Sequence, residues 1–133
     1  MDTNSREGSD IRIAAIIVGW VISEAIGLFF GLIGGQAIGD FELLENLILF
    51  VIGPIGVLVG GFVAGDMSKN KRINHGGFVG IISVFFAIIF SLSQGYGFDE
   101  LFSIKIISSW VMIFFSGRIG DSIANRTSRI HES

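Results

Sequence analysis

Residues 13–39 read IAAIIVGWVISEAIGLFFGLIGGQAIG and decide how the chain folds. Every fourth position in this stretch carries one of the smallest side chains. These positions are Ala15, Gly19, Ser23, Gly27, Gly31, Gly35 and Gly39. Lipid tails are as apolar as leucine, so helices in a bilayer associate through close backbone contact, which small residues at i and i+4 permit. The stretch therefore predicts a membrane helix that packs tightly against its neighbours.

The small-residue ridge cannot contact the same neighbouring helix over its whole length. Residues four apart on a helix are rotated by about 400°, so the ridge turns by roughly 40° at each step. We expect its two ends to face different neighbouring helices. Ridge residues that no helix of the same chain covers would suit a contact with a second copy of the protein. Matching small residues stand in the later apolar runs. They are Gly56, Gly60, Gly61, Ala64 and Gly65, then Gly76, Gly80, Ser83, Ala87, Ser91 and Gly95, then Ser116, Gly120 and Ala124.

The composition places the chain among membrane proteins. Of its 133 residues 50% are hydrophobic and one is proline, which is too apolar for an ordinary soluble domain of this length. The apolar residues form runs at about 13–38, 43–64, 76–92 and 101–119. Each run is close to the roughly 20 residues that a helix needs to cross about 30 Å of hydrocarbon. We predict an all-α integral membrane four-helix bundle forming a single domain over residues 1–133.

The two halves of the sequence resemble each other. Gln36-Ala-Ile-Gly-Asp-Phe-Glu-Leu43 matches Gln94-Gly-Tyr-Gly-Phe-Asp-Glu-Leu101. This predicts two tandem helical hairpins, at about 11–66 and 74–123, with polar termini at 1–10 and 125–133. Units with an even number of helices insert in the same orientation. Shared apolar composition also produces such matches, so both a duplication and a coincidence stay open.

The charges predict an orientation in the membrane. Basic residues gather on one side of the predicted spans, at Arg6, Arg12, Lys69, Lys71, Arg72, Arg118, Arg126 and Arg129, with Lys105 on the other side. The opposite loops carry Asp40, Glu42, Glu45, Asp99 and Glu100. By the positive-inside rule we expect a multi-pass plasma-membrane protein with both termini in the cytoplasm. The net charge of −3 gives no general attraction to nucleic acid, so the lipid bilayer is the expected partner.

Polar residues, glycine and proline mark the limits and bends of the predicted helices. The predicted N-terminal caps are Asp40, Asn74 and Asp99, and the predicted stops are Gly65 and Gly95. Gly53-Pro54 removes the hydrogen bond to the carbonyl of Phe50 and predicts a bend in the second helix.

Glu24 is the one acid near the middle of a predicted span. A buried carboxyl is costly in a bilayer, which makes it a functional hypothesis by default. Two interpretations stay open. In the first, the carboxyl is structural and bonds Ser23, Trp20 or a hydroxyl of a facing helix such as Ser83, Ser109 or Ser116. In the second, it is a candidate proton or ligand site, because a membrane carboxyl can take up and release a proton.

Gln36 and Gln94 occupy matching places near the outer ends of the first and third helices. They are the other candidate ligand residues, because they could line an outer vestibule. The alternative is a pair of interfacial glutamines that bond across the bundle.

Two resemblances to known families follow from local motifs. Gly60-Gly-Phe-Val-Ala-Gly65, a short polar loop and Gly76-Gly-Phe-Val-Gly80 resemble the centre of an uncharacterised family of small prokaryotic, largely archaeal, four-helix membrane proteins. This resemblance implies the four-span layout and no particular activity. More weakly, Ser23-Glu-Ala-Ile-Gly27 resembles the first helix of the small multidrug resistance transporters, in which a membrane-embedded glutamate exchanges protons for cationic drugs. That resemblance implies such a role for Glu24 alone, because the aromatic-glycine pattern of that family's third helix is missing here.

Two function classes remain from the sequence. The first is a structural or assembly component that packs through glycine-rich helix faces, as a homo-oligomer or as a subunit of a larger membrane complex. The alternative is a proton-coupled transporter or small pore that uses Glu24. We expect no enzyme, cofactor or metal site, because the sequence has no Cys, no phosphate-binding loop and no metal-ligand spacing around His75 or His131.

Overall fold

The computed structural model describes residues 12–68 and 73–132 of the chain. All regular secondary structure within these two ranges is helical, which confirms the all-α prediction. The elements are α2 (Ile13–Ala37), α3 (Phe41–Leu47), the π-helical turn η1 (Ile48–Ile52), α4 (Gly53–Met67), α5 (His75–Ser93), α6 (Phe98–Leu101) and α7 (Ile104–Glu132). The polar residues 1–10 and the basic residues Lys69, Lys71 and Arg72, which the orientation prediction uses, lie outside these ranges.

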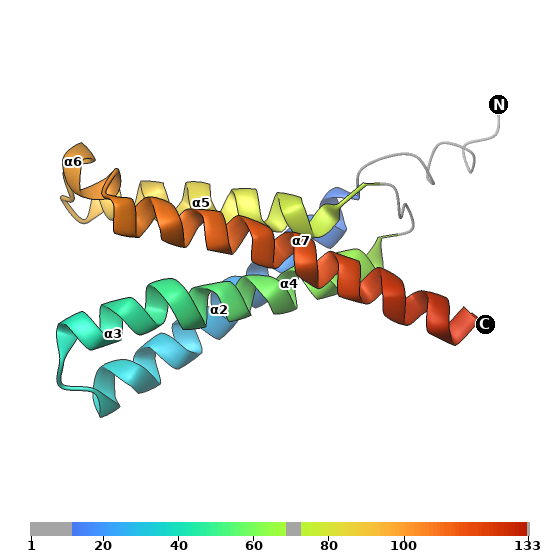
Figure 1. Ribbon diagram of the computed structural model, residues 1–133, viewed down its shortest axis with the longest axis horizontal. Helices are drawn as coiled ribbons and strands as arrows, with labels where there is room; N and C mark the ends of the chain where they lie inside the picture. The colour runs from blue at the N-terminus through green and yellow to red at the C-terminus, as the bar shows by residue number, and fades with distance from the viewer. Residues whose placement is uncertain (1–11, 69–72, 133) are drawn as a thin grey trace.

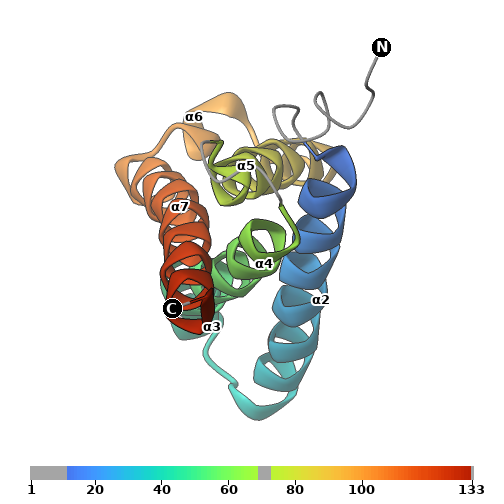
Figure 2. The ribbon, with the colours of Figure 1, turned by 90° about the vertical axis from the view of Figure 1, so that its right-hand side faces the viewer.

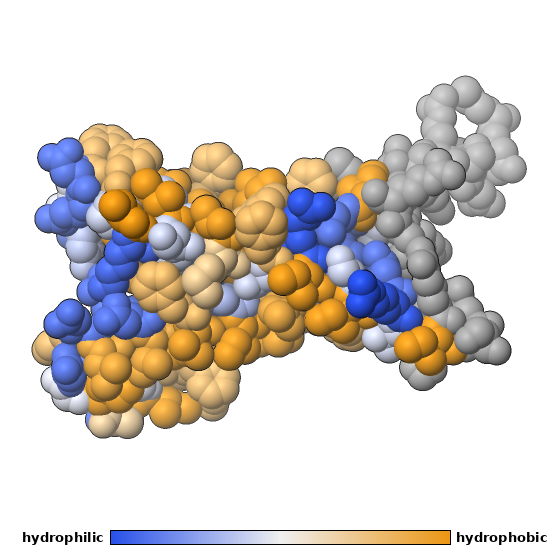
Figure 3. All heavy atoms as spheres, in the orientation of Figure 1, coloured by the Kyte–Doolittle hydropathy of each residue, from blue (hydrophilic) through white to orange (hydrophobic). Residues whose placement is uncertain are grey.

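Of the helices in the described ranges, three segments are long and apolar enough to cross a membrane. They are Ile13–Ala37, Phe41–Met67 and His75–Ser93. Large apolar side chains such as Leu28 and Leu32, each 67% exposed, cover their outer faces, and Figure 3 shows hydrophobic residues over the middle of one side of the molecule. α7 is longer but carries Lys105, Arg118 and Asp121, so the fourth span and the complete four-helix bundle stay predictions.

α4 lies at the centre of the molecule and contacts α2, α5 and α7 (Figure 2). The long helices come together near the start of α2, the end of α4 and the start of α5, which we call the closed end (Figure 1). They separate toward α3 and α6, which we call the open end. The tandem relation between the two halves stays a prediction.

At the closed end, α2 and α4 touch through their backbones. A Cβ atom placed on Gly60 would overlap the carbonyl oxygen of Gly19. One turn along, a Cβ on Gly56 would lie 3.0 Å from the carbonyl oxygen of Ser23. These small residues therefore bring the two main chains into direct contact, which side chains of ordinary size would prevent.

α7 docks on α4 and α5 through Gly117. A Cβ on Gly61 of α4, or on Gly76 of α5, would overlap the carbonyl oxygen of Gly117. Gly80 continues the α5 contact, with its Cβ position 3.0 Å from the Cα atom of Phe114. Gly117 is not recognisable from i+4 spacing, because it lies outside the series Ser116, Gly120 and Ala124.

Gly65 was predicted to end a helix, and this prediction is wrong. α4 continues to Met67, and Gly65 packs against α7, where a Cβ would lie 2.9 Å from the Cα atom of Asp121. The residue is small because α7 passes close to it.

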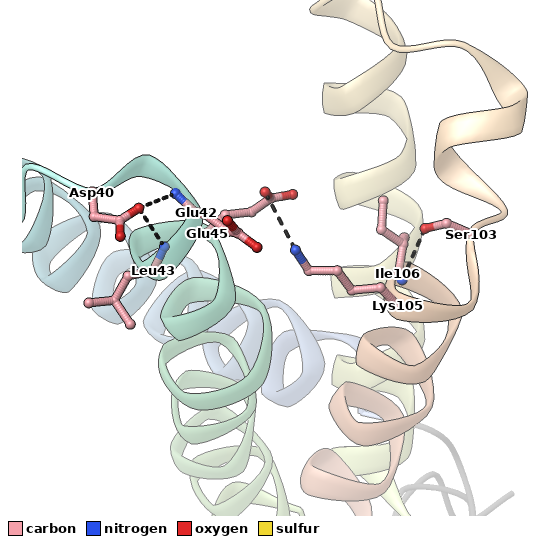
Figure 4. A network of polar contacts seen from close by, with 7 residues as sticks. All are labelled: Asp40, Glu42, Leu43, Glu45, Ser103, Lys105 and Ile106. Atoms are coloured by element: carbon pink, nitrogen blue, oxygen red, sulfur yellow. Dashed lines mark hydrogen bonds and ion pairs between the residues drawn. The ribbon is translucent and has the colours of Figure 1, made fainter.

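Two of the three predicted caps are confirmed. Asp40 accepts the backbone N–H groups of Glu42 at 3.0 Å and Leu43 at 3.3 Å and caps α3 (Figure 4). Asn74 accepts the backbone N–H of Gly77 at 2.7 Å and caps α5. The prediction for Asp99 is wrong, because Asp99 lies inside the short α6 and the long α7 begins at Ile104.

Gly95 follows α5 with a φ of 90°, the left-handed conformation that suits glycine after a helix. The predicted stop at Gly95 is therefore confirmed.

The predicted bend at Gly53-Pro54 takes the form of a π-helical turn. In η1 the N–H of Gly53 reaches back to the carbonyl of Ile48, one residue further than in an α-helix. If this register continued by one residue, Pro54, which has no N–H, would stand opposite the carbonyl of Leu49, whereas the sequence had indicated the carbonyl of Phe50. The hydroxyl of Ser109 on α7 donates to that Leu49 carbonyl at 2.9 Å, as a neighbouring helix must in a bilayer.

Two buried side chains connect helix ends at the closed end. His75 is fully buried at the start of α5, and its Nε2 accepts the backbone N–H of Arg12 at 2.9 Å. Asp121 of α7 is 1% exposed and accepts the backbone N–H of Gly76 at 3.0 Å. Each satisfies a backbone donor at the start of a helix from a distant part of the sequence.

Gly60→Ala tests the backbone contact between α2 and α4. We expect it to lower the free energy of unfolding by about 1–3 kcal/mol, because the added methyl group overlaps main-chain atoms that cannot rotate away. Gly27→Ala is the matched control, because its Cβ would meet no atom within 4 Å. It should leave stability unchanged or raise it by up to about 1 kcal/mol through helix propensity. Circular dichroism during SDS titration measures both, and equal losses would contradict the prediction.

Candidate binding cleft

A cleft of about 520 Å³ lies toward the open end of the molecule. Residues of α2 and α5 line it on two sides, and residues of η1 and α4 with one residue of α7 complete it. Its deepest lining residues include Val57 and Ile113, which are 3% and 9% exposed, whereas Leu28 and Leu32 at its edge are largely exposed. The surface of the cleft is therefore mainly aliphatic and aromatic.

The small-residue ridge of α2 changes its surroundings along the helix. Gly19 lies against the backbone of α4, whereas a Cβ on Gly27 or Gly31 would meet no atom within 4 Å. Both of these glycines line the cleft. Further on, a Cβ on Gly35 would lie 4.0 Å from a methyl group of Leu44, and a Cβ on Gly39 would meet no described atom within 4 Å. The ridge therefore packs inside the chain over its first half only.

Aromatic side chains form the α5 side of the cleft. The rings of Phe86 and Phe90 stack with centroids 6.3 Å apart, and both line the cleft. Trp20 of α2 packs edge-on against Phe86 with centroids 5.5 Å apart, which joins α2 to α5. These aromatic residues could not be recognised as part of a site from the sequence, because phenylalanine is frequent in all the apolar runs.

Glu24 is half-buried and lines the cleft. Its carboxyl faces the indole N–H of Trp20 and the hydroxyl of Ser83. Both of these atoms are buried, yet neither has a hydrogen-bond partner of normal geometry. We call Trp20, Glu24 and Ser83 the polar cluster. An unpaired buried polar group costs about 1–3 kcal/mol, so the Trp20 and Ser83 groups of this cluster are incompletely satisfied within the described residues.

Two other predicted partners of Glu24 are bonded elsewhere. The hydroxyl of Ser109 donates to the carbonyl of Leu49 at 2.9 Å. The hydroxyl of Ser116 donates to the carbonyl of Met112 in its own helix at 2.7 Å. Of the predicted partners, the structure therefore brings Trp20 and Ser83 to the carboxyl.

The structure does not group Gln36 or Gln94 with Glu24. Both glutamines are exposed at the open end, and neither lines the cleft. An ion pair between Lys105 and Glu45, 3.6 Å long, connects α7 to α3 in the same region (Figure 4). The two side chains are 38% and 55% exposed, and exposed ion pairs contribute little to stability. This pair therefore adds little to the contact between α3 and α7.

The chemistry of the cleft suits binding. Among the residues that the structure describes, no three His, Asp or Glu side chains are placed to hold a metal ion. The cleft presents the carboxyl of Glu24 and the side chains of Ser23 and Ser83 beside a broad apolar surface, and the buried indole N–H of Trp20 lies behind the carboxyl. A few convergent polar groups in an apolar pocket are typical of a binding site in which an apolar ligand is oriented through one polar group.

Comparison of the chain with protein families, with curated proteins and with solved structures gives no match. The two family resemblances drawn from local motifs therefore stay predictions.

Ser83→Ala tests whether the polar cluster is unsatisfied. Because the Ser83 hydroxyl has no partner, its removal should leave the free energy of unfolding unchanged or raise it slightly. Ser109→Ala is the control at an equally buried serine, and it should lower that free energy by about 1 kcal/mol because a hydrogen bond is lost. SDS titration measures both variants. A larger loss for Ser83→Ala than for Ser109→Ala would contradict the prediction.

Proposed function

We propose that this protein is a membrane assembly component that receives a transmembrane helix in its cleft. The observation that carries the proposal is the unoccupied space beside Gly27 and Gly31, which line the cleft and meet no side chain or backbone of their own chain. Assembly of this kind requires no catalytic residue.

The closed end supports this proposal by showing how the chain uses small residues. There, Gly19 and Gly60 bring two helices into backbone contact. Burying apolar side chains does not drive helices together in lipid, whereas close backbone approach does. A helix that reached Gly27 and Gly31 would make the same kind of contact. The exposed Leu28 and Leu32 beside them would flank such a helix.

The proposal places the protein in the plasma membrane with α7 as the fourth span. Arg118 contacts Gly77 at the start of α5, Arg126 lies about two turns further along α7, and Lys105 pairs with Glu45 at the open end. This distribution supports a cytoplasmic closed end by the positive-inside rule. The cleft would then open in the outer half of the bilayer.

Gly31→Leu tests the proposed assembly. The leucine side chain would fill the cleft, so association with a leucine- and alanine-rich transmembrane peptide should weaken by about tenfold, as expected for one lost helix contact. Fluorescence energy transfer between labelled chain and labelled peptide in lipid vesicles measures the association. Gly35→Leu is the control on the same helix, because Gly35 lies beside Leu44 and does not line the cleft. Unchanged association in Gly31→Leu would refute the proposal.

A second candidate function is the proton-coupled movement of a lipid-soluble cation. The cleft volume of about 520 Å³ favours it, because small-molecule sites enclose roughly 300–1,000 Å³, and Glu24 would supply the exchangeable carboxyl.

Glu24→Gln tests this second function. Vesicles containing the wild-type chain should accumulate tetraphenylphosphonium in response to a proton gradient, and the variant should lose this flux because it cannot exchange a proton. Glu42→Gln, at an exposed acid of α3, is the control and should retain the flux. Equal uptake by Glu24→Gln and wild type would exclude a transport role for this carboxyl.

A further inference from the structure

We propose that the helix received by the cleft carries a basic side chain at the depth of Glu24, and that it therefore belongs to a different protein. This inference rests on the proposed assembly function and names the chemistry of the partner.

The first observation is that Glu24 has no basic partner among the residues that the structure describes. No ion pair of Glu24 occurs in residues 12–68 and 73–132, where the recorded pair joins Lys105 and Glu45. Arg12 stands twelve positions earlier on the same chain, about 18 Å along the helix axis, and its guanidinium contacts the carbonyl of Met67 at 3.4 Å. The groups that face the carboxyl are the indole of Trp20 and the hydroxyl of Ser83.

The second observation is the unpartnered hydroxyl of Ser83. Ser83 is 6% exposed, lines the cleft and has no hydrogen-bond partner for its oxygen. A hydroxyl oxygen can accept a hydrogen bond, and a carboxylate can accept several. A lysine ammonium has three donors and an arginine guanidinium has five, so either group could bond both Glu24 and Ser83. One basic side chain entering from the cleft would therefore donate to the Glu24 carboxyl and to the Ser83 oxygen.

The third observation is that a second copy of this chain does not bring a basic residue to this depth. All nine Lys and Arg residues lie outside the segments 13–37, 41–67 and 75–93. On α7, Lys105 is at the open end, and the guanidinium carbon of Arg118 lies 6.0 Å from the ring centroid of Phe114, whose backbone packs against Gly80 of α5. Ser83, which faces Glu24, lies about one turn further into α5. A copy in the same orientation would therefore leave Glu24 unpaired, which favours a different partner.

Designed peptides test the inference. The full chain is placed in phosphatidylcholine vesicles with a leucine- and alanine-rich helix of about 22 residues that carries Lys, Leu or Glu at its centre. Fluorescence energy transfer between labelled chain and labelled peptide gives the apparent dissociation constant. We expect the Lys peptide to bind about tenfold more tightly than the Leu peptide, and the Glu peptide to bind more weakly than both.

Variants of the chain show which residues cause the preference for the Lys peptide over the Leu peptide. Glu24→Gln keeps the size of the side chain and should reduce the preference for Lys over Leu to about twofold or less, and Ser83→Ala should reduce it in part. Glu42→Gln, which removes an exposed acid from α3, should keep the full preference. A preference that survives Glu24→Gln would overturn the inference.

The remaining outcomes separate the inference from the proposed function. Equal binding of the Lys and Leu peptides, with both weakened by Gly31→Leu, would overturn the basic partner and support the assembly role. Pairing of the chain with itself through Gly31, without peptide binding, would overturn the different partner and again support assembly. Absence of every association would overturn both proposals. Saturable binding of tetraphenylphosphonium at Glu24 in that case would favour the second candidate function.

Discussion

The carbonyl oxygens of Gly19, Gly60 and Gly117 each lie against a residue that has no side chain, and these contacts set the separation of the long helices at the closed end. Gly19 and Gly60 join α2 to α4, and Gly117 joins α7 to both α4 and α5. In lipid this contact is a main source of helix association, because apolar side chains gain nothing by leaving the hydrocarbon. The His75 and Asp121 hydrogen bonds then fix helix ends that this packing has already brought together.

Tight packing at one end has a geometrical consequence at the other. The small-residue ridge of α2 turns by about 40° at each step of four residues, so it leaves the surface of α4 within a few turns. Beyond that point Gly27 and Gly31 face the cleft. The π-helical turn η1 lies at the same level and contributes Ile48 and Leu49 to the cleft. The cleft therefore lies where the regular helix α2 separates from the bent segment formed by η1 and α4.

The polar cluster places the polar groups of the cleft together at one position on its otherwise apolar surface. The Trp20 indole and the Ser83 hydroxyl are buried beside Glu24 without a bond of normal geometry, whereas the equally buried Ser109 is bonded to Leu49. The difference has a physical meaning. The Ser109 hydroxyl bonds a backbone carbonyl in the turn that precedes Pro54. The Trp20 and Ser83 groups satisfy no backbone group among the described residues. Glu24 and Ser83 both line the cleft, which suits a polar group that comes from another molecule.

The sequence by itself determined the local features of the chain. Apolar run length determined the membrane-type helices, Asp40 and Asn74 determined two helix starts, and Gly95 determined a stop, because each depends on interactions within a few residues. It also identified Glu24 and the small-residue faces. It failed at Asp99 and Gly65, where a short extra helix and the passage of α7 changed the local outcome.

Only the tertiary structure decided which small residues are covered. Periodicity shows that a face is small, but a neighbour must be placed in space before Gly19 can be distinguished from Gly31. The same holds for the role of Gly117, for the Ser109 bond to Leu49, and for the burial of Asp121. The physical reason is that each of these depends on contact between segments far apart in the chain, which no local pattern encodes.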